Sequence, residues 1–306
     1  MSTILEPGQI EASAVMPPFL HLPPRNLFER RAERLAQLAE GNALGDYLRL
    51  VARLCRLQQQ LVDNPPSGLP VAEERQRLCI SHGLPPLAAD SLVREGPWLP
   101  WLQVLLEGFD EANDGPLGKA VQTLRDSAES QRKGWGIALL AGQYDAVPAA
   151  LVPFLGAALQ AAWSSWLLAL PEAELKPAGS LAQCPACGSQ AMAGLVRNRG
   201  KHNGLRYLAC SLCACEWHVV RVKCVYCESS KGLRYTSLED DRHAPGKAPL
   251  RAECCPGCQR YLKHHYLEND AYAEPLADDL ASLALDIRLD EEGFHRLAPN
   301  LMLAPG

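Results

Sequence analysis

The sequence predicts an α+β protein of more than one domain, with a helical first half, a small β region built around cysteines, and a C-terminal helix. Three observations predict this class. Apolar residues recur at helical spacing before about residue 170, four C-x-x-C pairs crowd into the next part of the chain, and a further amphipathic run lies near the C-terminus. With 306 residues the chain is long enough for two or three domains.

Residues 1–175 are expected to form an all-α domain with an extended N-terminal arm. The run LGDYLRLVARLCRLQQQLVDN places apolar residues at i, i+3 and i+4, which is the stripe of a helix that packs against its neighbours. No strand-like alternation of comparable length precedes residue 190. Further helices are expected at 98–112, 116–130, 132–142 and 149–169.

The longest uncharged stretch, Ala146 to Leu170, reaches the length of a membrane span. It also contains two prolines, Gln160, Ser164 and Ser165, and it is flanked by acidic residues rather than by a basic anchor. We therefore expect a buried core helix and no association with a membrane.

The cysteine content bears on the compartment. Twelve cysteines in a secreted chain would indicate disulfides. The first 27 residues, however, have no basic region followed by an apolar one, and prolines interrupt them. A cytoplasmic protein is expected.

Beyond residue 180 the pattern changes to short alternating runs, which predict strands. MAGLVR and LRYLAC flank the turn-forming RNRGKHNG, while EWHVVRVK and GLRYTSL precede a polar loop at 239–249. We expect a first four-cysteine module at 181–222 and a second at 223–272.

The last segment, 273–306, is expected to form a helix and tail that dock back onto the rest of the chain. An amphipathic pattern predicts the helix, and Gly293 marks its end. Its apolar face is expected to hold Leu276, Leu280, Leu283 and Ile287.

The four C-x-x-C pairs have the spacing of metal-binding knuckles, in which a tight turn points both sulfurs at one centre. The intervals of 22 and 27 residues between successive knuckles can each hold two strands and a turn, as in a zinc ribbon or a rubredoxin-like fold. The simplest pairing is sequential, and an interleaved cross-brace stays open. The predicted ligands are Cys184, Cys187, Cys210 and Cys213 for the first tetrahedral site and Cys224, Cys227, Cys255 and Cys258 for the second.

Zinc and iron both accept four thiolates in a tetrahedron, so the spacing does not choose between them. Redox dithiols are disfavoured, because four pairs in a short β region without a βαβ unit favour metal. A glycine after the second cysteine relieves the positive φ that a knuckle can require. Gly188 meets this preference, whereas Ala214, Glu228 and Gln259 stand at the other three positions and fit the motif less closely.

Other cysteines and histidines receive no role from the pattern. Buried thiols are common in helices, and the cysteines beside the knuckles lack the knuckle spacing. The two histidines could bind a metal only in place of a lost cysteine. These residues are Cys55, Cys79, Cys215, Cys254, His264 and His265.

The net charge of −5 is unevenly distributed, because residues 181–267 hold 13 basic and 6 acidic side chains, a balance of +7. A four-thiolate site with a divalent ion contributes −2, so two sites would reduce this to about +3. The basic excess is thus expected to offset thiolates rather than to bind nucleic acid. Phosphate-loop, dinucleotide and hydrolase motifs are not found, and we expect a protein that is not an enzyme.

Three runs, GLRYLACSLCACEWHVVRVKCVYC, ECCPGCQRYLK and ADDLASLALDIRLDEEGF, resemble the formate dehydrogenase accessory protein FdhE family. The match covers about residues 180–306, and the helical half resembles the family in layout and in PPRNLFERRAERL. The resemblance implies a cytoplasmic maturation factor for respiratory formate dehydrogenase, which binds the molybdenum-containing catalytic subunit before export by the twin-arginine route. It also implies rubredoxin-like modules, so two iron ions per chain are expected, with zinc as the alternative.

The expected partner is therefore the catalytic subunit of formate dehydrogenase, and a homodimer is left open. Competing functions are a zinc-ribbon nucleic-acid binder and a small rubredoxin-like electron-transfer protein. Candidates for the partner surface, for which packing within the strands is the alternative explanation, are Arg206, Tyr207, Trp217, His218 and Arg221.

Overall fold

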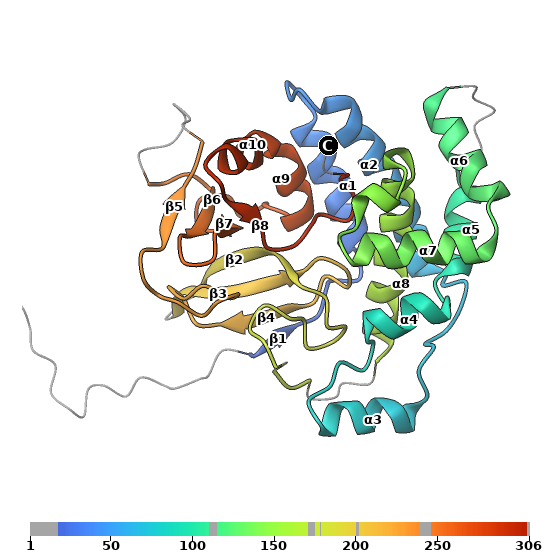
Figure 1. The fold of residues 1–306 in the computed structure, drawn as a ribbon, viewed down its shortest axis with the longest axis horizontal. Coiled ribbons are helices and arrows are strands. Elements are labelled where there is room, and N and C mark those ends of the chain that lie inside the picture. Colours follow the sequence, from blue (N-terminus) through green and yellow to red (C-terminus); the bar gives the residue numbers. More distant parts are fainter. Residues whose placement is uncertain are drawn as a thin grey trace, which may run out of the picture.

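The computed structural model describes residues 18–109, 115–170, 175–177, 179–199, 202–238 and 246–304. Most helices lie on one side of the molecule and one sheet lies on the other, with the last two helices packed over the sheet (Figure 1). The molecule is thus a mixed helical and sheet structure. Most of the predicted N-terminal arm, residues 1–17, lies outside the described residues.

The first half is mainly helical, as predicted. Two short helices, α3 and α4, were not expected, because α3 has no apolar stripe and buries only Gln76. The expected helices from residue 98 onward correspond to α5 to α8 with shifted ends, and residues 110–112 of the first of them lie outside the described residues. The helices are α1 (Leu27–Leu38), α2 (Gly45–Asp63), α3 (Glu73–Ser81), α4 (Ala89–Glu95), α5 (Leu99–Glu107), α6 (Pro116–Asp126), α7 (Glu129–Leu140), the short η2 (Tyr144–Ala146) and η3 (Ala149–Leu151), and α8 (Val152–Ala169).

Helix α8 forms the centre of the helical half. It is long and apolar enough to cross a membrane, yet 94% of its most apolar window is buried inside the protein. Helices α2, α5 and α7 pack against it, and within it the Trp163 and Trp166 rings lie 4.8 Å apart. The expected core helix is therefore present, and its apolar surface is covered by the chain's own helices.

The strands form one sheet in the order β1-β4-β3-β2-β7-β6-β5, with β8 paired to β7. The edge strand β1 comes from the N-terminal segment, where Leu20 pairs with Trp217. This corrects the expectation of helices alone before residue 190. The strands are β1 (Leu20–His21), β2 (Ala191–Arg199), β3 (His202–Cys210), β4 (Glu216–Val219), β5 (Arg234–Thr236), β6 (Leu250–Cys255), β7 (Arg260–Tyr266) and β8 (His295–Arg296).

Strands of the two expected cysteine modules meet in the middle of this sheet. β2 runs parallel to β7, with Ala193 opposite Lys263 and Leu195 opposite His265. The close approach requires Gly194, because a Cβ there would lie 2.6 Å from the Nδ1 atom of His264. The two modules therefore share a continuous hydrogen-bonded sheet.

The predicted C-terminal helix is two helices, α9 (Pro275–Ala281) and α10 (Leu283–Glu291). The break at Ser282 rotates the second helix, so that Leu285 and Leu289 are buried while Ile287 is 57% exposed. The expectation that Ile287 belongs to the apolar face is wrong for this reason. The docking of the segment is nevertheless observed, since α9 packs against α1 and β2.

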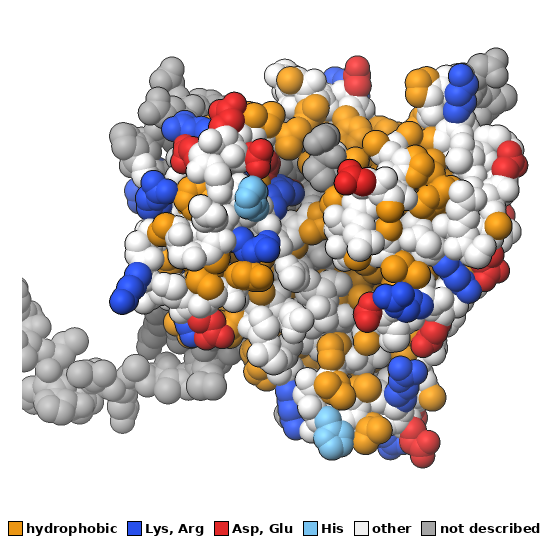
Figure 2. Space-filling model, viewed as in Figure 1, with side chains coloured by type: hydrophobic (Ala, Val, Ile, Leu, Met, Phe, Trp, Pro, Cys, Tyr) orange, Lys and Arg blue, Asp and Glu red, His pale blue; other side chains and the backbone are white. Residues whose placement is uncertain are grey.

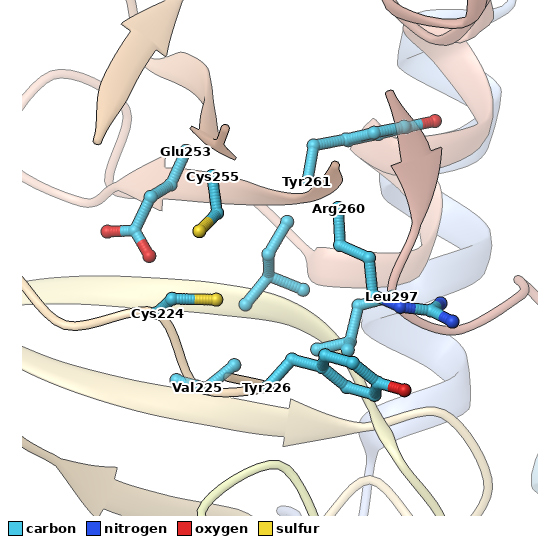
Figure 3. Close-up of a pocket in the computed structure, with 9 residues that line it drawn as sticks. Cys224, Val225, Tyr226, Glu253, Cys255, Arg260, Tyr261 and Leu297 are labelled. Atoms are coloured by element: carbon cyan, nitrogen blue, oxygen red, sulfur yellow. The ribbon is translucent and has the colours of Figure 1, made fainter. Parts of the chain in front are cut away.

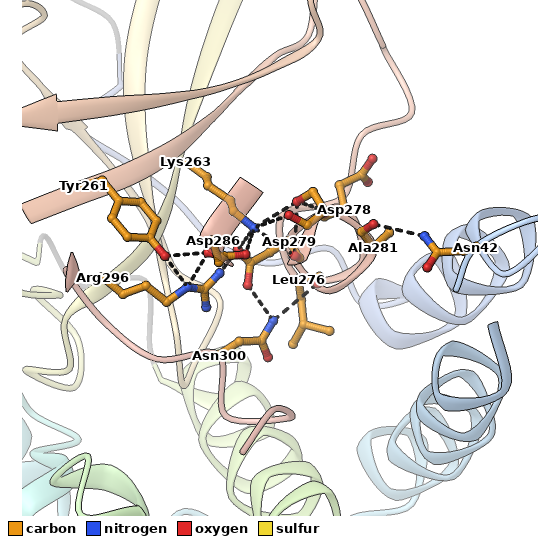
Figure 4. A network of polar contacts seen from close by, with 11 residues as sticks. Asn42, Tyr261, Lys263, Leu276, Asp278, Asp279, Ala281, Asp286, Arg296 and Asn300 are labelled. Atoms are coloured by element: carbon orange, nitrogen blue, oxygen red, sulfur yellow. Dashed lines mark hydrogen bonds and ion pairs between the residues drawn. The ribbon is translucent and has the colours of Figure 1, made fainter. Parts of the chain in front are cut away.

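Ionic contacts fasten these last elements to the sheet (Figure 4). The Lys263 ammonium, only 1% exposed as a side chain, lies 3.1 Å from Asp279 and 2.5 Å from Asp286. Arg296 pairs with the same two carboxylates, and Asn300 donates to Asp279 at 2.9 Å. Buried charges persist only when they are paired in this way.

The apolar interior divides into unequal parts. The main core is continuous from the helices through the knuckles at 184–187 and 210–213 to Trp217. A smaller core lies between β6, β7 and α10, and its buried members are Ala252, Cys254, Tyr261, Leu285, Leu289 and Phe294. The main core also includes Val225 and Leu262 of the second half, so the smaller core adds to it rather than replacing it there.

Candidate metal centres

The first cluster gathers Cys184, Cys187, Cys210 and Cys213, and all four sulfurs lie within 4.8 Å of one another. Cys184 Sγ lies 3.6 Å from Cys213 Sγ, and Cys187 Sγ lies 3.4 Å from Cys210 Sγ. No thiol of the four is more than 3% exposed. The sulfurs come from the loop before β2 and from the end of β3, which pair antiparallel and so bring two distant knuckles together.

The second cluster gathers Cys224, Cys227, Cys255 and Cys258. Its sulfur distances are 3.7 Å between Cys224 and Cys258 and 3.6 Å between Cys227 and Cys255. Both clusters therefore follow the sequential pairing. Unlike the first cluster, this one has a ligand edge at the surface, since Cys227 is exposed and Cys258 is half-buried.

These sulfur positions fit a metal ion. Four sulfurs at about 2.3 Å from a zinc ion form a tetrahedron with edges of about 3.8 Å, close to the short sulfur distances in both clusters. Thiolates select zinc or iron over harder cations, and the geometry is common to both metals. The chain thus contains two four-cysteine clusters that could hold metal ions.

The backbone of the knuckles explains how the chain makes these turns. In three of them the N–H of the first cysteine donates to the carbonyl five residues later, at 2.8 Å for Cys184 and 2.9 Å for Cys210 and Cys224. An additional N–H, that of Leu212, points at Cys210 Sγ at 3.4 Å. Donors aimed at a sulfur stabilise its thiolate form.

The residue after the second cysteine adopts positive φ in all four knuckles. The angles are +78° at Gly188, +55° at Ala214, +61° at Glu228 and +54° at Gln259. Glycine at this position was expected to be the better fit, yet the three other residues accept the strained conformation. The turn itself, rather than glycine, is therefore the common feature.

Helix α8 holds the second knuckle of the first cluster from the side. Gln160 Nε2 donates to the Ser211 carbonyl at 2.8 Å, and Ser164 Oγ donates to the Cys213 carbonyl at 3.3 Å. In the sequence these polar residues stand out only as interruptions of an apolar run. Their spacing of four residues, which puts both on one face of a helix, is the signal that could have identified them.

The first knuckle of the same cluster is held by the segment that leads into α4. Leu87 N–H donates to the Ala186 carbonyl, and Ala89 N–H donates to the Cys187 carbonyl, each at 2.9 Å. The Leu87 carbonyl in turn accepts from Trp163 of α8 at 2.9 Å. The first cluster is therefore clamped between the helical half and the sheet.

The second cluster lies beside a surface pocket at the other end of the sheet (Figure 3). The Cys224 and Cys255 sulfurs face the same space, and Glu253 lies at one side of it. At the other side the Arg260 guanidinium lies 4.3 Å from the centre of the Tyr226 ring.

Each cluster combines thiols whose pKa is raised with one thiol whose pKa is lowered. Burial raises the pKa of Cys184 and of Cys213 well above the usual range, which favours the neutral thiol. At Cys187 hydrogen bonds from the neighbouring thiols outweigh burial and lower the pKa. In the second cluster a backbone hydrogen bond from Ser229 lowers the pKa of Cys227. The thiol with the lowered pKa is thus buried in the first cluster and exposed in the second.

Arg206 of β3 connects the two modules from inside the protein. Its guanidinium donates to the Val220 carbonyl at 2.6 Å and to the Lys223 carbonyl at 2.7 Å, and it pairs with Glu253 of β6 at 3.0 Å. Glu253 also accepts from the Tyr235 hydroxyl at 2.6 Å. The buried Arg206 guanidinium thus holds the linker between the two clusters in place.

The five candidates for a partner surface are not all at the surface. Arg206 and Tyr207 are 1% exposed and Trp217 is 3% exposed, so the structure corrects that expectation for these three. Trp217 Nε1 donates to the Leu181 carbonyl at 2.9 Å, as expected of strand packing. His218 is half-buried, and Arg221 is exposed.

The remaining thiols and histidines lie outside both clusters. Cys215 and Cys254 are buried beside the knuckles, and burial raises the pKa of Cys254 to about 11. His264 and His265 are each 1% exposed. None of the four belongs to a group of potential ligands within the described part of the chain.

Family models match almost the whole chain. The model described as FdhE, N-terminal, matches residues 16–180, the one described as FdhE, central domain, matches 183–221, and the one described as FdhE, C-terminal domain, matches 222–303. The helical half, which carried little recognisable signal in the sequence, is therefore matched as fully as the cysteine region.

Individual relatives agree with these models. A protein named "Protein FdhE homolog" from Pseudomonas putida KT2440 is 85% identical over 306 residues, which is 100% of this chain and 96% of that protein. Another of the same name, from Pseudomonas aeruginosa PAO1, is 62% identical and covers 99% of this chain and 98% of its own. The crystal structure of the FdhE protein from Pseudomonas aeruginosa superposes with a TM-score of 0.89 at 61% identity, over 94% of this chain and 100% of that one.

Proposed function

The chain belongs to the FdhE family, and from this premise we propose that it is an accessory protein that matures respiratory formate dehydrogenase by binding its catalytic subunit. The protein is proposed to act in the cytoplasm, before that subunit is exported, and to be a binding protein rather than an enzyme. The observation that carries the proposal is the full-length family match of a chain with two four-cysteine clusters.

Each cluster of four cysteines is proposed to hold one metal ion. Iron is favoured over zinc through the family resemblance, and the sulfur geometry accommodates either. When bound, the ion supplies a positive charge that stabilises four thiolates and, if it is iron, a one-electron couple. Metal analysis and the visible spectrum of protein purified without oxygen test the assignment, since only iron gives thiolate charge-transfer bands.

At the first cluster the surrounding residues have a structural role, whereas at the second cluster they leave one ligand accessible. Gln160 and Ser164 orient the carbonyls of a first-cluster knuckle, which keeps the helical half and the sheet in fixed register. Cys227 leaves the second cluster open to solvent. A client protein could therefore reach the second cluster without the chain unfolding.

Co-purification tests the proposed function directly. The full chain should retain the catalytic subunit of formate dehydrogenase from a cytoplasmic extract, and a cell that lacks this protein should regain formate dehydrogenase activity when the gene is restored. A catalytic subunit of an unrelated molybdenum enzyme is the control. Absence of both retention and restored activity would refute the proposal.

Electron transfer at the second cluster is the second candidate, and the exposed Cys227 edge favours it. A rubredoxin-like role requires iron, reversible bleaching of its absorption, and reduction by a physiological donor at a useful rate. A colourless zinc protein that still restores activity would rule it out.

A further inference from the structure

We propose that the docking surface for the catalytic subunit is the segment 220–228 together with Arg260, hereafter the linker patch. Its occupant is an acidic segment of that subunit that also presents an apolar side chain. The inference rests on the proposed function and specifies where that binding takes place.

The linker patch exposes apolar side chains that the chain does not cover. Val220 is 65% exposed, Val222 is 56% exposed and Tyr226 is 47% exposed. All three fall within seven residues of one another and adjoin the exposed ligand Cys227. Exposed apolar side chains that gather in one region, with charged residues around them, mark protein interaction sites.

The backbone of the patch is held in an unusual conformation. Val222 has φ of +60°, and it is the one β-branched residue with positive φ among those described. For a β-branched side chain this region is an outlier, and strain of this kind gathers at functional sites. Unlike Ala214, Glu228 and Gln259, Val222 does not follow a knuckle, so the cysteine clusters do not require its conformation.

Buried Arg206 imposes this conformation. Its guanidinium binds the carbonyls on both sides of the strained residue, those of Val220 and Lys223, while Glu253 holds it from β6. Arg206 is thus a positioning residue that turns the Val222 side chain outward. The sequence expectation had placed Arg206 at the partner surface itself, whereas here it acts from beneath that surface.

Charge selects an acidic occupant. Residues 220–238 carry four basic side chains and one acidic one, Glu228, which already pairs with Lys223 at 2.5 Å. This balance of +3 exceeds the −2 that a four-thiolate site with a divalent ion contributes, so the segment stays basic. Arg221 is exposed, and Arg260 lies over the exposed Tyr226. On the face shown in Figure 2, basic side chains lie along the edge near β5, whereas acidic ones lie over α10. Such a surface attracts acidic partners and repels basic ones.

The test measures binding of the purified full-length protein to the purified catalytic subunit by biolayer interferometry, at low and at high salt. Val222→Gly is the main variant, because glycine accepts positive φ freely and leaves the backbone unstrained while removing the side chain. We expect it to weaken binding at least about tenfold, a typical loss for an apolar anchor at an interface. Arg221→Glu should weaken binding at low salt and flatten the salt dependence.

Matched controls come from the helical half, outside the linker patch. Leu84 is 57% exposed, and Arg77 has a side chain that is 70% exposed. Leu84→Gly and Arg77→Glu repeat the two chemical changes and should bind as the parent does. Near-parental binding by both Val222→Gly and Arg221→Glu would overturn the linker patch while leaving the proposed function intact. Failure of the parent itself to bind would overturn the proposed function, and the linker patch with it.

Discussion

The two cysteine clusters are built from the same knuckle, yet the protein surrounds them differently. The first has four buried thiols and is held by hydrogen bonds from α8 and from the segment before α4. None of the second cluster's four ligands belongs to the main core, and Cys227 is exposed. The knuckle therefore sets the sulfur geometry. The packing around it determines whether a cluster is a buried structural centre, which connects the helices to the sheet, or a solvent-accessible centre.

The largest predicted difference follows the loss of one ligand. A structural metal contributes about 10 kcal/mol or more to folding, which equals the whole stability of a typical domain. Cys187→Ser should therefore leave the protein largely unfolded, because the first cluster belongs to the main core. Cys227→Ser should stay folded and lose one metal ion.

Circular dichroism and metal analysis of the two purified variants check this prediction. Cys79→Ser, which alters a half-buried thiol outside both clusters, is the control and should retain both ions. An equal loss of folded structure in Cys187→Ser and Cys227→Ser would contradict the distinction between a buried structural centre and an accessible one.

A smaller effect is expected where α9 and α10 are fastened to the sheet near the second cluster. Asp279→Asn removes one charge from a buried network and leaves Lys263 and Arg296 short of a partner, at a cost of about 3–5 kcal/mol. Urea denaturation measures it. The exposed ion pair of Arg94 with Asp90 supplies the control, since Asp90→Asn should cost less than about 1 kcal/mol.

The same network predicts how stability depends on pH. Burial alone would raise the pKa of Asp279, but the charges of Arg296 and Lys263 outweigh it and hold the pKa well below its usual value. A lowered pKa stabilises the folded state above the unfolded-state value of about 3.9, and this stabilisation is lost as the pH falls below it. Asp279→Asn should therefore differ from the parent most near neutral pH and progressively less below about pH 4, as urea denaturation over that range will measure.

The next prediction concerns the hydrogen bonds from α8 to the first cluster. Gln160→Leu removes a buried donor and leaves the Ser211 carbonyl without it, at a cost of about 2 kcal/mol. Gln58→Leu is the control, because Gln58 is also buried and donates to the Ala157 carbonyl of α8. Gln160 in addition accepts from Arg31 at 3.4 Å, a contact that affects stability and involves no knuckle. Both variants should lose stability, but only Gln160→Leu should speed metal release from the first cluster.

The smallest effects concern knuckle strain. A non-glycine residue with positive φ costs about 1–2 kcal/mol of stability. Glycine removes this cost, but its greater conformational freedom in the unfolded state cancels part of the gain. Ala214→Gly and Glu228→Gly should therefore each raise the free energy of unfolding by about 0.5–1 kcal/mol. Denaturant midpoints at fixed metal content provide the measurement, and a loss of stability in either variant would contradict the strain argument.

Much of the site could be predicted from the sequence because its information is local. Spacing alone identifies the knuckles, and the strand-rich intervals between them favour the sequential pairing that the structure adopts. The core helix α8 was predictable for a similar reason, since its apolar run is interrupted by residues that suit a protein interior better than a lipid bilayer.

What the sequence could not show depends on long-range contacts. The pairing of β2 with β7 joins segments about 70 residues apart, and no local pattern specifies it. The burial of Arg206 likewise depends on Glu253 and on two carbonyls of the linker. Ile287 was misassigned because a break at Ser282, rather than helical periodicity, determines which face of α10 is buried.

Metal release to a chelator tests the central claim most directly. Protein loaded with two ions is mixed with excess chelator, and the release of metal is followed over time. We predict two phases of equal size, one ion per chain each, with the fast phase absent from Cys227→Ser and the slow phase accelerated in Gln160→Leu. Release of both ions in a single phase, unchanged by Gln160→Leu, would contradict the account of one fixed cluster and one accessible cluster.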